Sequence, residues 1–312
     1  MSNLLSELTT EQRNEHTTHI DRLSSEQIVA LINEEDKNVT IAIEQITPFI
    51  AKAVDIIVGA FKREGRLFYV GAGTSGRLGI LDASECPPTY GTIPSMVQGI
   101  IAGGDQAIKE SVEGAEDNPE LGARDMDTYG VTSLDVVVGI AASGRTPYVL
   151  GAMKRAKEIG AKVIGLCNNE HTPMVQTADL MLEAVVGPEV ILGSTRMKSG
   201  SAQKQILNIL TTASMIQMGK VYENLMVDVM PSNEKLVFRA KRIISMATGA
   251  SEEAVHQAFV QSGGHVKTAI VMILAQVDFN GAKQLLEQTN GFVRLALLQA
   301  EMEATEHIKG GM

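Results

Sequence analysis

The 312-residue chain is poor in cysteine, has no tryptophan, and contains neither a long apolar run nor a basic block. Its two cysteines, Cys86 and Cys167, cannot build a disulfide framework, which favours a reducing compartment. No apolar run is long enough for a membrane span, and the polar N-terminus, which contains acids, is unlike a secretory signal. A net charge of −10 without a Lys/Arg block disfavours nucleic acid as the main partner. We therefore expect a cytoplasmic protein that binds neither membrane nor nucleic acid.

The stretch Phe68–Arg77 predicts a strand that ends in a glycine-rich turn and continues as a helix. This arrangement directs free backbone N–H groups at an anion, and Thr74 and Ser75 add two hydroxyls to the turn. Gly71, Gly73 and Gly76 spell GxGxxG, but no acid closes the next strand as dinucleotide binding would require. We therefore interpret the turn as a phosphate cradle.

A second loop with hydroxyls, residues 142–147, follows the strongly β-branched run Asp135–Ala141. Ligands collect at the carboxyl ends of parallel strands, so the two loops could hold one phosphate from both sides. Further strands are expected at 96–102, 162–166 and 180–186, with helices between them. The alternation predicts a parallel sheet covered by helices on both faces.

Helix boundaries are predicted from turn, proline and capping residues. Ser24 and Gln27 have capping-box spacing at the start of a first helix. A second helix is expected over 38–63, where Pro48 marks either a kink or a late start. The helix after the glycine turn should end near Glu85, before Pro87 and Pro88. Helices are also expected over about 106–115 and from about 199 to 225, and only helices over 233–308.

Two acids and one polar loop are further candidates. Glu85 and Glu116 each lie at the far end of the segment that follows a strand, where two carboxyl groups could divide acid and base work. Surface acids at helix ends are the simpler interpretation of their spacing. The loop Gly193–Gly200 carries two cations before a long helix, which suits either an anion-binding wall or a helix cap. The six histidines show no convincing metal-ligand pattern, so we expect no metal.

Four blocks of this sequence resemble the N-acetylmuramic acid 6-phosphate etherases. They are Gly71–Gly91, Ile28–Asp36, Gly187–Lys204 and Gly263–Ile270. The resemblance covers nearly the whole chain and implies an SIS-type (sugar isomerase) fold. That fold is an α/β three-layer αβα sandwich with a five-stranded parallel sheet. We expect N-terminal helices over 1–50, the phosphosugar-binding domain over 51–230 and a small C-terminal helical domain over 231–312.

The resemblance also implies the reaction and the residues that perform it. The 6-phosphosugar would lose D-lactate by elimination and then gain water, without a cofactor and in a homodimer. Glu85 is expected to protonate the leaving oxygen and Glu116 to remove the C2 proton. The expected phosphate ligands are Thr74, Ser75, Gly76, Ser143, Gly144 and Thr146. Other expected substrate-binding residues are Arg77, Ser194, Thr195, Arg196, Lys198, His265 and Lys267, with Arg196 or Lys198 meeting the lactyl carboxylate.

Two other functions fit parts of the pattern. Glucokinase regulatory protein shares the blocks and binds phosphosugars without catalysis, although it is about twice as long, with a duplicated sugar-binding domain. A phosphosugar isomerase would use the same fold and release no acid. The second loop has Ala141 where SIS proteins usually begin with a hydroxyl residue, which leaves one phosphate donor fewer.

Overall fold

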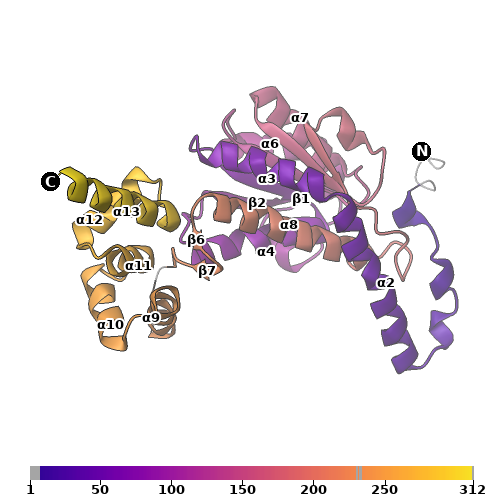
Figure 1. Ribbon diagram of the computed structural model, residues 1–312. Helices are drawn as coiled ribbons and strands as arrows, with labels where there is room; N and C mark the ends of the chain where they lie inside the picture. Colours follow the sequence, from indigo (N-terminus) through magenta and orange to yellow (C-terminus); the bar gives the residue numbers. More distant parts are fainter. Residues whose placement is uncertain (1–7, 230, 232–233, 311–312) are drawn as a thin grey trace. The chain divides into compact units, whose positions relative to one another are not determined.

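A computed structural model of the protein describes residues 8–229, 231 and 234–310 (Figure 1). The chain divides into two compact units, which we describe separately. The first comprises the residues up to Ser84 together with Pro94–Thr212, and the second comprises Glu85–Ile93 together with Ala213 onwards. The domain bounds expected from the sequence stay a prediction. Within the described residues, no helix combines the length and the apolar character needed to cross a membrane.

A parallel sheet of five strands forms the centre of the first unit, as the sequence predicts. The strands are β1 (Leu67–Gly71), β2 (Val97–Ile101), β3 (Val136–Ile140), β4 (Lys162–Cys167) and β5 (Leu180–Glu183). They are arranged in the order β2-β1-β3-β4-β5. Every residue of β1 and β3 is buried, which explains why both read as continuous apolar runs rather than as alternating ones. Because β1 pairs directly with β3, the loops that follow these two strands are neighbours.

Helices cover both faces of the sheet, which gives the expected three layers (Figure 1). On one face α7 (Pro147–Ile159) contacts β1, β3 and β4, and α6 (Pro119–Thr128) packs against α7. The core of this layer includes Phe68, Val137 and Met153, all of them fully buried. The other layer contains α3 (Thr47–Phe61), α4 (Gly73–Tyr90) and α8 (Lys198–Gln217). The class α/β and the three-layer architecture around a five-stranded parallel sheet are thus as predicted.

One buried carboxylate joins α4 to α8. Asp82 accepts hydrogen bonds from Tyr69 Oη (3.1 Å), Asn208 Nδ2 (2.6 Å) and Thr211 Oγ1 (3.2 Å). Burial raises the pKa of Asp82 although these bonds act to lower it. The α4 helix also approaches the sheet closely, since a Cβ on Gly99 would meet the Ile80 backbone at 2.6 Å.

The prediction that α4 ends near Glu85 is wrong. The helix continues to Tyr90 with Pro87 and Pro88 inside its last turn. Each proline removes only one backbone donor, and the helical pattern resumes with the Gly91 N–H donating to the Pro87 carbonyl at 2.9 Å. Near a helix end, a missing donor disturbs few subsequent bonds.

The other helix boundaries are partly as expected. The capping box at Ser24 and Gln27 is confirmed and begins α2 (Ser25–Gln45). Of the two alternatives for the helix expected over 38–63, the late start at Pro48 is confirmed, because the chain breaks at Ile46 and α3 has Pro48 in its first turn. The helix expected over 106–115 is only α5 (Gln106–Lys109), followed by the 3₁₀ turn η4 (Ala115–Asp117). α6 was missed, and α8 ends earlier than the sequence suggests.

The N-terminal segment runs through three 3₁₀ turns before α2. They are η1 (Thr9–Glu11), η2 (Glu15–Thr17) and η3 (Ile20–Arg22). Side chains fasten it to the first unit, with Thr9 Oγ1 donating to Asn169 Oδ1 (2.8 Å) and Thr17 Oγ1 to the Val190 carbonyl (2.8 Å). A further turn, η5 (Pro173–Gln176), follows β4.

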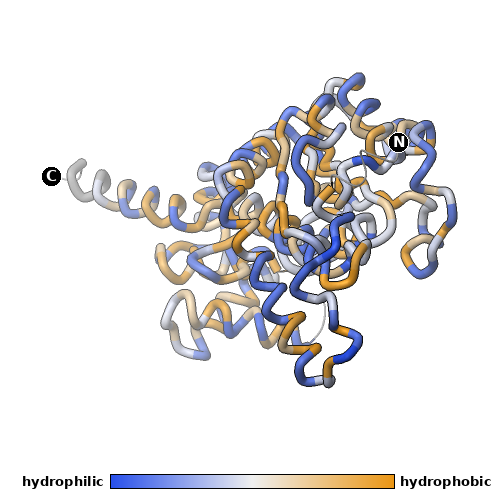
Figure 2. The backbone as a smooth tube through the Cα atoms, turned by 90° about the vertical axis from the view of Figure 1, so that its right-hand side faces the viewer, coloured by the Kyte–Doolittle hydropathy of each residue, from blue (hydrophilic) through white to orange (hydrophobic). Residues whose placement is uncertain are grey.

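The second unit is helical around its own core, as predicted for the C-terminal part. Its helices are α9 (Glu234–Thr248), α10 (Glu252–Gln261), α11 (Val266–Ala275), α12 (Phe279–Gln288) and α13 (Val293–Gly310). Ile270 and Val271 of α11 are fully buried among them. The alternation of hydrophobic and hydrophilic residues along α13 is visible beside the C-terminus in Figure 2. A two-stranded antiparallel hairpin, β6 (Val221–Tyr222) and β7 (Leu225–Met226), precedes these helices.

Asp135 offers a stability prediction at the start of β3. Its carboxylate is 1% exposed and accepts from Arg66 N (2.7 Å), Arg66 Nη2 (2.8 Å) and Thr132 N (2.7 Å). Burial alone would raise the pKa of Asp135, but the bonds from Arg66 and Thr132 outweigh burial and lower it. Asp135→Asn should therefore lower the free energy of unfolding by roughly 3 kcal/mol at pH 7, measured by urea denaturation.

The pH dependence of this effect follows from the direction of the shift. A carboxyl group with a depressed folded-state pKa stabilises the fold above its unfolded pKa, about 3.9, and loses that contribution as the pH falls through the folded value. The difference between the wild type and Asp135→Asn should therefore be constant above about pH 5 and shrink below about pH 4. If the difference in the free energy of unfolding stayed constant below about pH 4, the charge of Asp135 would not be the source of the stabilisation.

Candidate active site

A cavity of about 430 Å³ opens at the carboxyl ends of β1 and β3, within the first unit. Both predicted loops contribute to its wall, together with η4 and the N-terminal turn η1. The lining residues are Glu11, Ala72, Gly73, Thr74, Ser75, Glu116, Asp117, Ile140, Ala141, Ala142, Ser143, Arg145, Thr146, Pro147, Gly193 and Thr195. The structure thus brings together the two hydroxyl loops that the sequence places far apart.

Two helices begin at this cavity. Gly73, the first residue of α4, and Pro147, the first residue of α7, both line it. The backbone N–H groups of a first helical turn have no partner inside their own helix, and the helix dipole adds partial positive charge there. An anion in the cavity would therefore meet donors from two directions without needing a lysine.

The predicted hydroxyl residues line the cavity, whereas two of the predicted glycines do not line it and instead allow the backbone conformation or close packing nearby. Thr74, Ser143 and Thr146 line the wall, and Ser143 Oγ accepts from Arg145 N–H at 3.2 Å, which leaves the Ser143 proton available to a ligand. Gly76 does not line the cavity. A Cβ there would meet Ile101 Cγ1 at 2.6 Å, so the glycine allows α4 to approach the sheet.

Gly144 also lies outside the lining. Its φ of +64° favours glycine, and a Cβ there would clash with the Thr172 side chain at 2.5 Å. The glycine therefore gives the second loop the shape that places its neighbours Ser143 and Arg145 at the cavity.

A buried hydrogen-bond chain supports Ser75 from behind. The Ser75 hydroxyl donates to Gln203 Oε1 (2.8 Å), Gln203 Nε2 donates to Asn168 Oδ1 (2.9 Å), and Asn168 Nδ2 donates to the Ala184 carbonyl (2.8 Å). The carbonyl at the end can only accept, so it sets the direction of the whole chain. The chain fixes Ser75 to α8 and to the end of β4.

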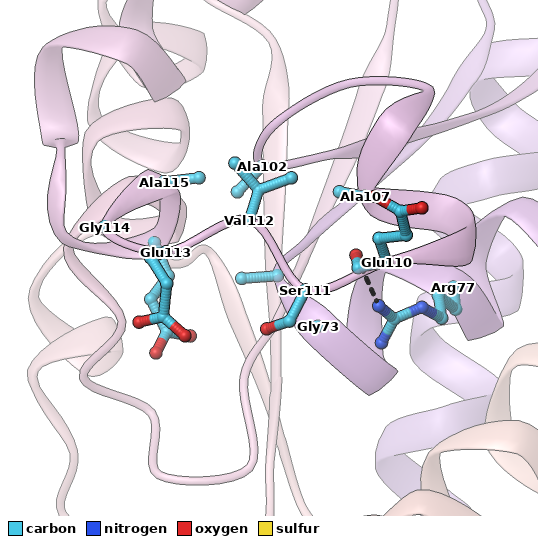
Figure 3. Close-up of a pocket in the computed structure, with 12 residues that line it drawn as sticks. Gly73, Arg77, Ala102, Ala107, Glu110, Ser111, Val112, Glu113, Gly114 and Ala115 are labelled. Carbon is cyan, nitrogen blue, oxygen red and sulfur yellow. Dashed lines mark hydrogen bonds between the residues drawn. The ribbon is translucent and has the colours of Figure 1, made fainter.

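The two predicted carboxylates have different surroundings. Glu116 is exposed on η4 and lines the large cavity. It also lines an adjoining cavity of about 300 Å³. Figure 3 shows other residues of this smaller cavity, among them Arg77 and Glu113. Glu85 is exposed, stands ten residues beyond Ser75 along α4, and belongs to the second unit. It lines neither cavity. The cavity with Glu116 is lined by residues of the first unit, so a role for Glu85 beside it stays a prediction.

Arg77 has partners in the protein. Its guanidinium donates to the carbonyls of Ile108 (3.0 Å) and Glu110 (3.1 Å), the second of which appears as a dashed line in Figure 3. These bonds hold the segment after α5 against α4, at the wall of the smaller cavity. A direct contact between Arg77 and substrate stays a prediction.

The loop before α8 contributes Gly193 and Thr195 to the large cavity, whereas Ser194 and Arg196 are not among its lining residues. Lys198 is 1% exposed, and its amine lies 2.6 Å from Glu35 Oε2. Burial acts to raise the pKa of Glu35, but bonds from Lys198, His16 and Asn14 lower it overall. Lys198 thus anchors the loop to α2, away from the cavity wall.

The buried carboxylate of Glu189 fixes the same loop from the other side. It accepts from the backbone N–H groups of Lys198 and Ser199, both at 2.9 Å, and so caps the start of α8. The cap thus comes from Glu189, outside Gly193–Gly200, and Lys198 and Ser199 are buried rather than solvated. Thr195 of the same loop lines the cavity, and its contact with an anion stays a prediction.

The last two predicted residues belong to the second unit. His265 is exposed at the start of α11. Lys267 shares one carboxylate oxygen of Asp228 with Lys220, at 2.8 and 3.0 Å. Burial lowers the pKa of Lys267 despite the nearby Asp228. Their contact with substrate stays a prediction.

Several cavity or support residues were missed by reasoning from sequence alone, among them Glu11, Arg145 and Gln203. Arg145 stands inside the second hydroxyl loop, so its neighbours could have signalled it. Glu11 and Gln203 carry no local motif, since only the fold brings their segments to the cavity. The described residues contain no group of three His, Cys, Asp or Glu side chains placed to hold a metal.

Comparison with known families gives two overlapping matches. Residues 49–157 match the family described as glucokinase regulatory protein N-terminal SIS domain, and residues 115–213 match the SIS domain. Among solved structures, a phosphoheptose isomerase from Francisella tularensis aligns with a TM-score of 0.48 at 18% identity, over 61% of this chain and 100% of that chain.

Comparison with individual proteins is more specific. An N-acetylmuramic acid 6-phosphate etherase of Photorhabdus laumondii is 56% identical over 93% of this chain and 96% of its own. Proteins of that same name in Glaesserella parasuis and Geobacillus thermodenitrificans are 56% and 54% identical. They cover 92% and 94% of this chain, and 94% and 100% of their own lengths. The chain therefore belongs to the N-acetylmuramic acid 6-phosphate etherase family.

Proposed function

We propose that this protein is an enzyme that cleaves the lactyl ether of N-acetylmuramic acid 6-phosphate with water. The products are N-acetylglucosamine 6-phosphate and D-lactate, as expected for the recycling of peptidoglycan amino sugars in the cytoplasm. The observation that carries the proposal is the identity of 53–56% to etherases over nearly the whole chain. The cavity supports it, because two helix N-termini and three hydroxyls suit a phosphorylated sugar.

The chemistry explains why a carboxylate should stand beside a phosphate site. Direct hydrolysis of an ether is difficult, because alkoxide is a poor leaving group. Opening of the sugar ring exposes an aldehyde at C1, which makes the C2 proton acidic and places the lactyl ether in the beta position. A base then removes the C2 proton while an acid protonates the departing oxygen and the C3–O bond breaks. Water then adds its oxygen to C3 of the unsaturated aldehyde, and a proton returns to C2. Each C–O bond change is thus coupled to a proton transfer, which positioned acid and base groups can provide.

Each step of this reaction can be assigned to residues of the cavity or to Glu85. The first turns of α4 and α7, with the hydroxyls of Thr74, Ser143 and Thr146, hold the 6-phosphate and so orient the distant C2 and C3. Ser75 contributes its backbone N–H, because its hydroxyl proton is donated to Gln203. Glu116 acts as the base at C2, since it is the predicted acid that lines the cavity. Glu85 acts as the acid at the lactyl oxygen and later activates the water.

A homodimer would reconcile the role of Glu85 with its position. Glu85 does not line the cavity that contains Glu116, so a second copy of the chain is one source of the acid. Most oligomers of one chain are two-fold symmetric, and such a dimer would complete two equivalent sites. We propose this arrangement because it keeps both acids in the reaction.

The first experiment is incubation of the purified protein with N-acetylmuramic acid 6-phosphate and an assay for D-lactate. An etherase releases one lactate per sugar consumed. A regulator is the second candidate, favoured by the match of residues 49–157 to the glucokinase regulatory protein family. A regulator would bind the phosphosugar and release no lactate, and that result would reject the proposed reaction.

A further inference from the structure

Arg145 is the one cation in the wall of the large cavity, among the residues that the structure describes. Its backbone N–H is used within the loop, where it donates to Ser143 Oγ. Its side-chain Nε is buried and has no hydrogen-bond partner in the described structure. A buried donor without a partner is costly, and this donor would be satisfied if a ligand drew the Arg145 side chain toward the cavity that the residue lines.

The other ionisable side chains in the wall are all acids. Glu11, Glu116 and Asp117 line the same cavity. Under the proposed function, the substrate carries two anionic groups, a phosphate and a lactyl carboxylate, into this acidic cavity. The helix N-termini and hydroxyls provide for the phosphate, but none of them is a full positive charge.

The chemistry fixes where the second anion must lie. The lactyl ether is attached at C3, next to the C2 proton that Glu116 is proposed to remove. The lactyl carboxylate therefore comes close to Glu116, where two like charges would repel each other unless a cation stands between or beside them. Arginine is suited to this task because its planar guanidinium binds a carboxylate through two parallel hydrogen bonds.

We infer that Arg145 binds the lactyl carboxylate and so selects the ether substrate over phosphosugars that lack it. The inference rests on the proposed function and replaces the earlier expectation for Arg196 or Lys198. The amine of Lys198 is paired with Glu35 in the interior, and Arg196 does not line the cavity. In this role Arg145 is a substrate-binding residue and takes no part in proton transfer.

The test compares two ligands that differ by the lactyl group. Arg145→Gln should raise the KM for N-acetylmuramic acid 6-phosphate by about ten- to a hundredfold, the range expected for a hydrogen bond to a charged group. The Kd for N-acetylglucosamine 6-phosphate, which carries the phosphate but no lactyl group, should change less than about threefold. Arg145→Lys should give an intermediate KM, because lysine keeps the positive charge but cannot form the bidentate pair of hydrogen bonds. Arg124→Gln, an exposed position on α6 outside the cavity, is the matched control.

The outcomes separate the possible roles. Equal weakening of both ligands would place Arg145 at the phosphate and overturn the inference, and so would no weakening of either. A loss specific to the lactyl sugar in Arg196→Gln, absent in Arg145→Gln, would also overturn it. If Arg145→Gln does not fold, Arg145→Lys with an analogue whose lactyl carboxylate is an amide provides the test. The amide should bind the wild type and Arg145→Lys equally, and unequal binding would contradict the inference. Absence of lactate release by the wild type would instead reject the proposed function itself.

Discussion

Glu116→Gln is expected to lower the kcat for lactate release by about a hundred- to ten-thousandfold, the usual contribution of one positioned base. The substitution keeps the size of the side chain and removes its ability to accept the C2 proton. Glu116 lines the cavity and is exposed to solvent, so the fold should not depend on its charge. The measurement is the initial rate of D-lactate formation at saturating substrate.

Binding distinguishes this effect from general damage. Removing a negative charge near a bound phosphate should leave the Kd for N-acetylglucosamine 6-phosphate unchanged or slightly lower it. Glu120→Gln is a suitable control, since Glu120 is exposed in the first turn of α6 and lines neither cavity. Near-normal lactate release by Glu116→Gln would remove Glu116 from the reaction.

Mixing two inactive variants should restore activity. Glu85→Gln alone is expected to lose lactate release to a similar degree, because the leaving oxygen would no longer be protonated. In a two-fold dimer with sites shared between copies, a Glu85→Gln chain paired with a Glu116→Gln chain contains one site with both acids and one site with neither. Random exchange of equal amounts makes about half of the dimers mixed, so about a quarter of wild-type activity should return.

Each alternative arrangement gives a different result in that mixture. If both acids of a site come from one chain, every site in every dimer lacks one of them and no activity returns. Glu85→Gln alone, taken through the same exchange procedure, gives the baseline activity. Size-exclusion chromatography with light scattering measures whether the chains form dimers. Full activity of Glu85→Gln alone would contradict its role as the acid, whatever the assembly.

The sheet and the two hydroxyl loops could be predicted from the sequence because their signals are local. Continuous apolar runs marked β1 and β3, and each run ended in glycine and hydroxyl residues of loops that line the cavity. The alternation of strands and helices along the chain predicted the parallel sheet that the structure has. Capping residues identified the start of α2 for the same reason, since the Ser24 and Gln27 contacts lie within one turn.

The remaining features depend on contacts between distant segments. Gln203 lies 128 positions from Ser75, and the turn that carries Glu11 is held by Asn169 from the end of β4. Lys198 is paired with Glu35, and no local motif reveals this partner because it lies 163 positions away. The continuation of α4 through Pro87 was missed for another reason, because proline near a helix end costs fewer hydrogen bonds than proline in its interior.

The central claim is elimination at C2 and C3 in the cavity formed by the two hydroxyl loops. The most direct test is turnover of N-acetylmuramic acid 6-phosphate in D₂O, with mass and NMR analysis of the products. Elimination and rehydration predict D-lactate together with N-acetylglucosamine 6-phosphate that carries carbon-bound deuterium at C2. Lactate released without deuterium at C2 would mean direct cleavage of the ether, and deuterium at C2 without lactate would mean isomerisation, so either result would contradict the proposed mechanism.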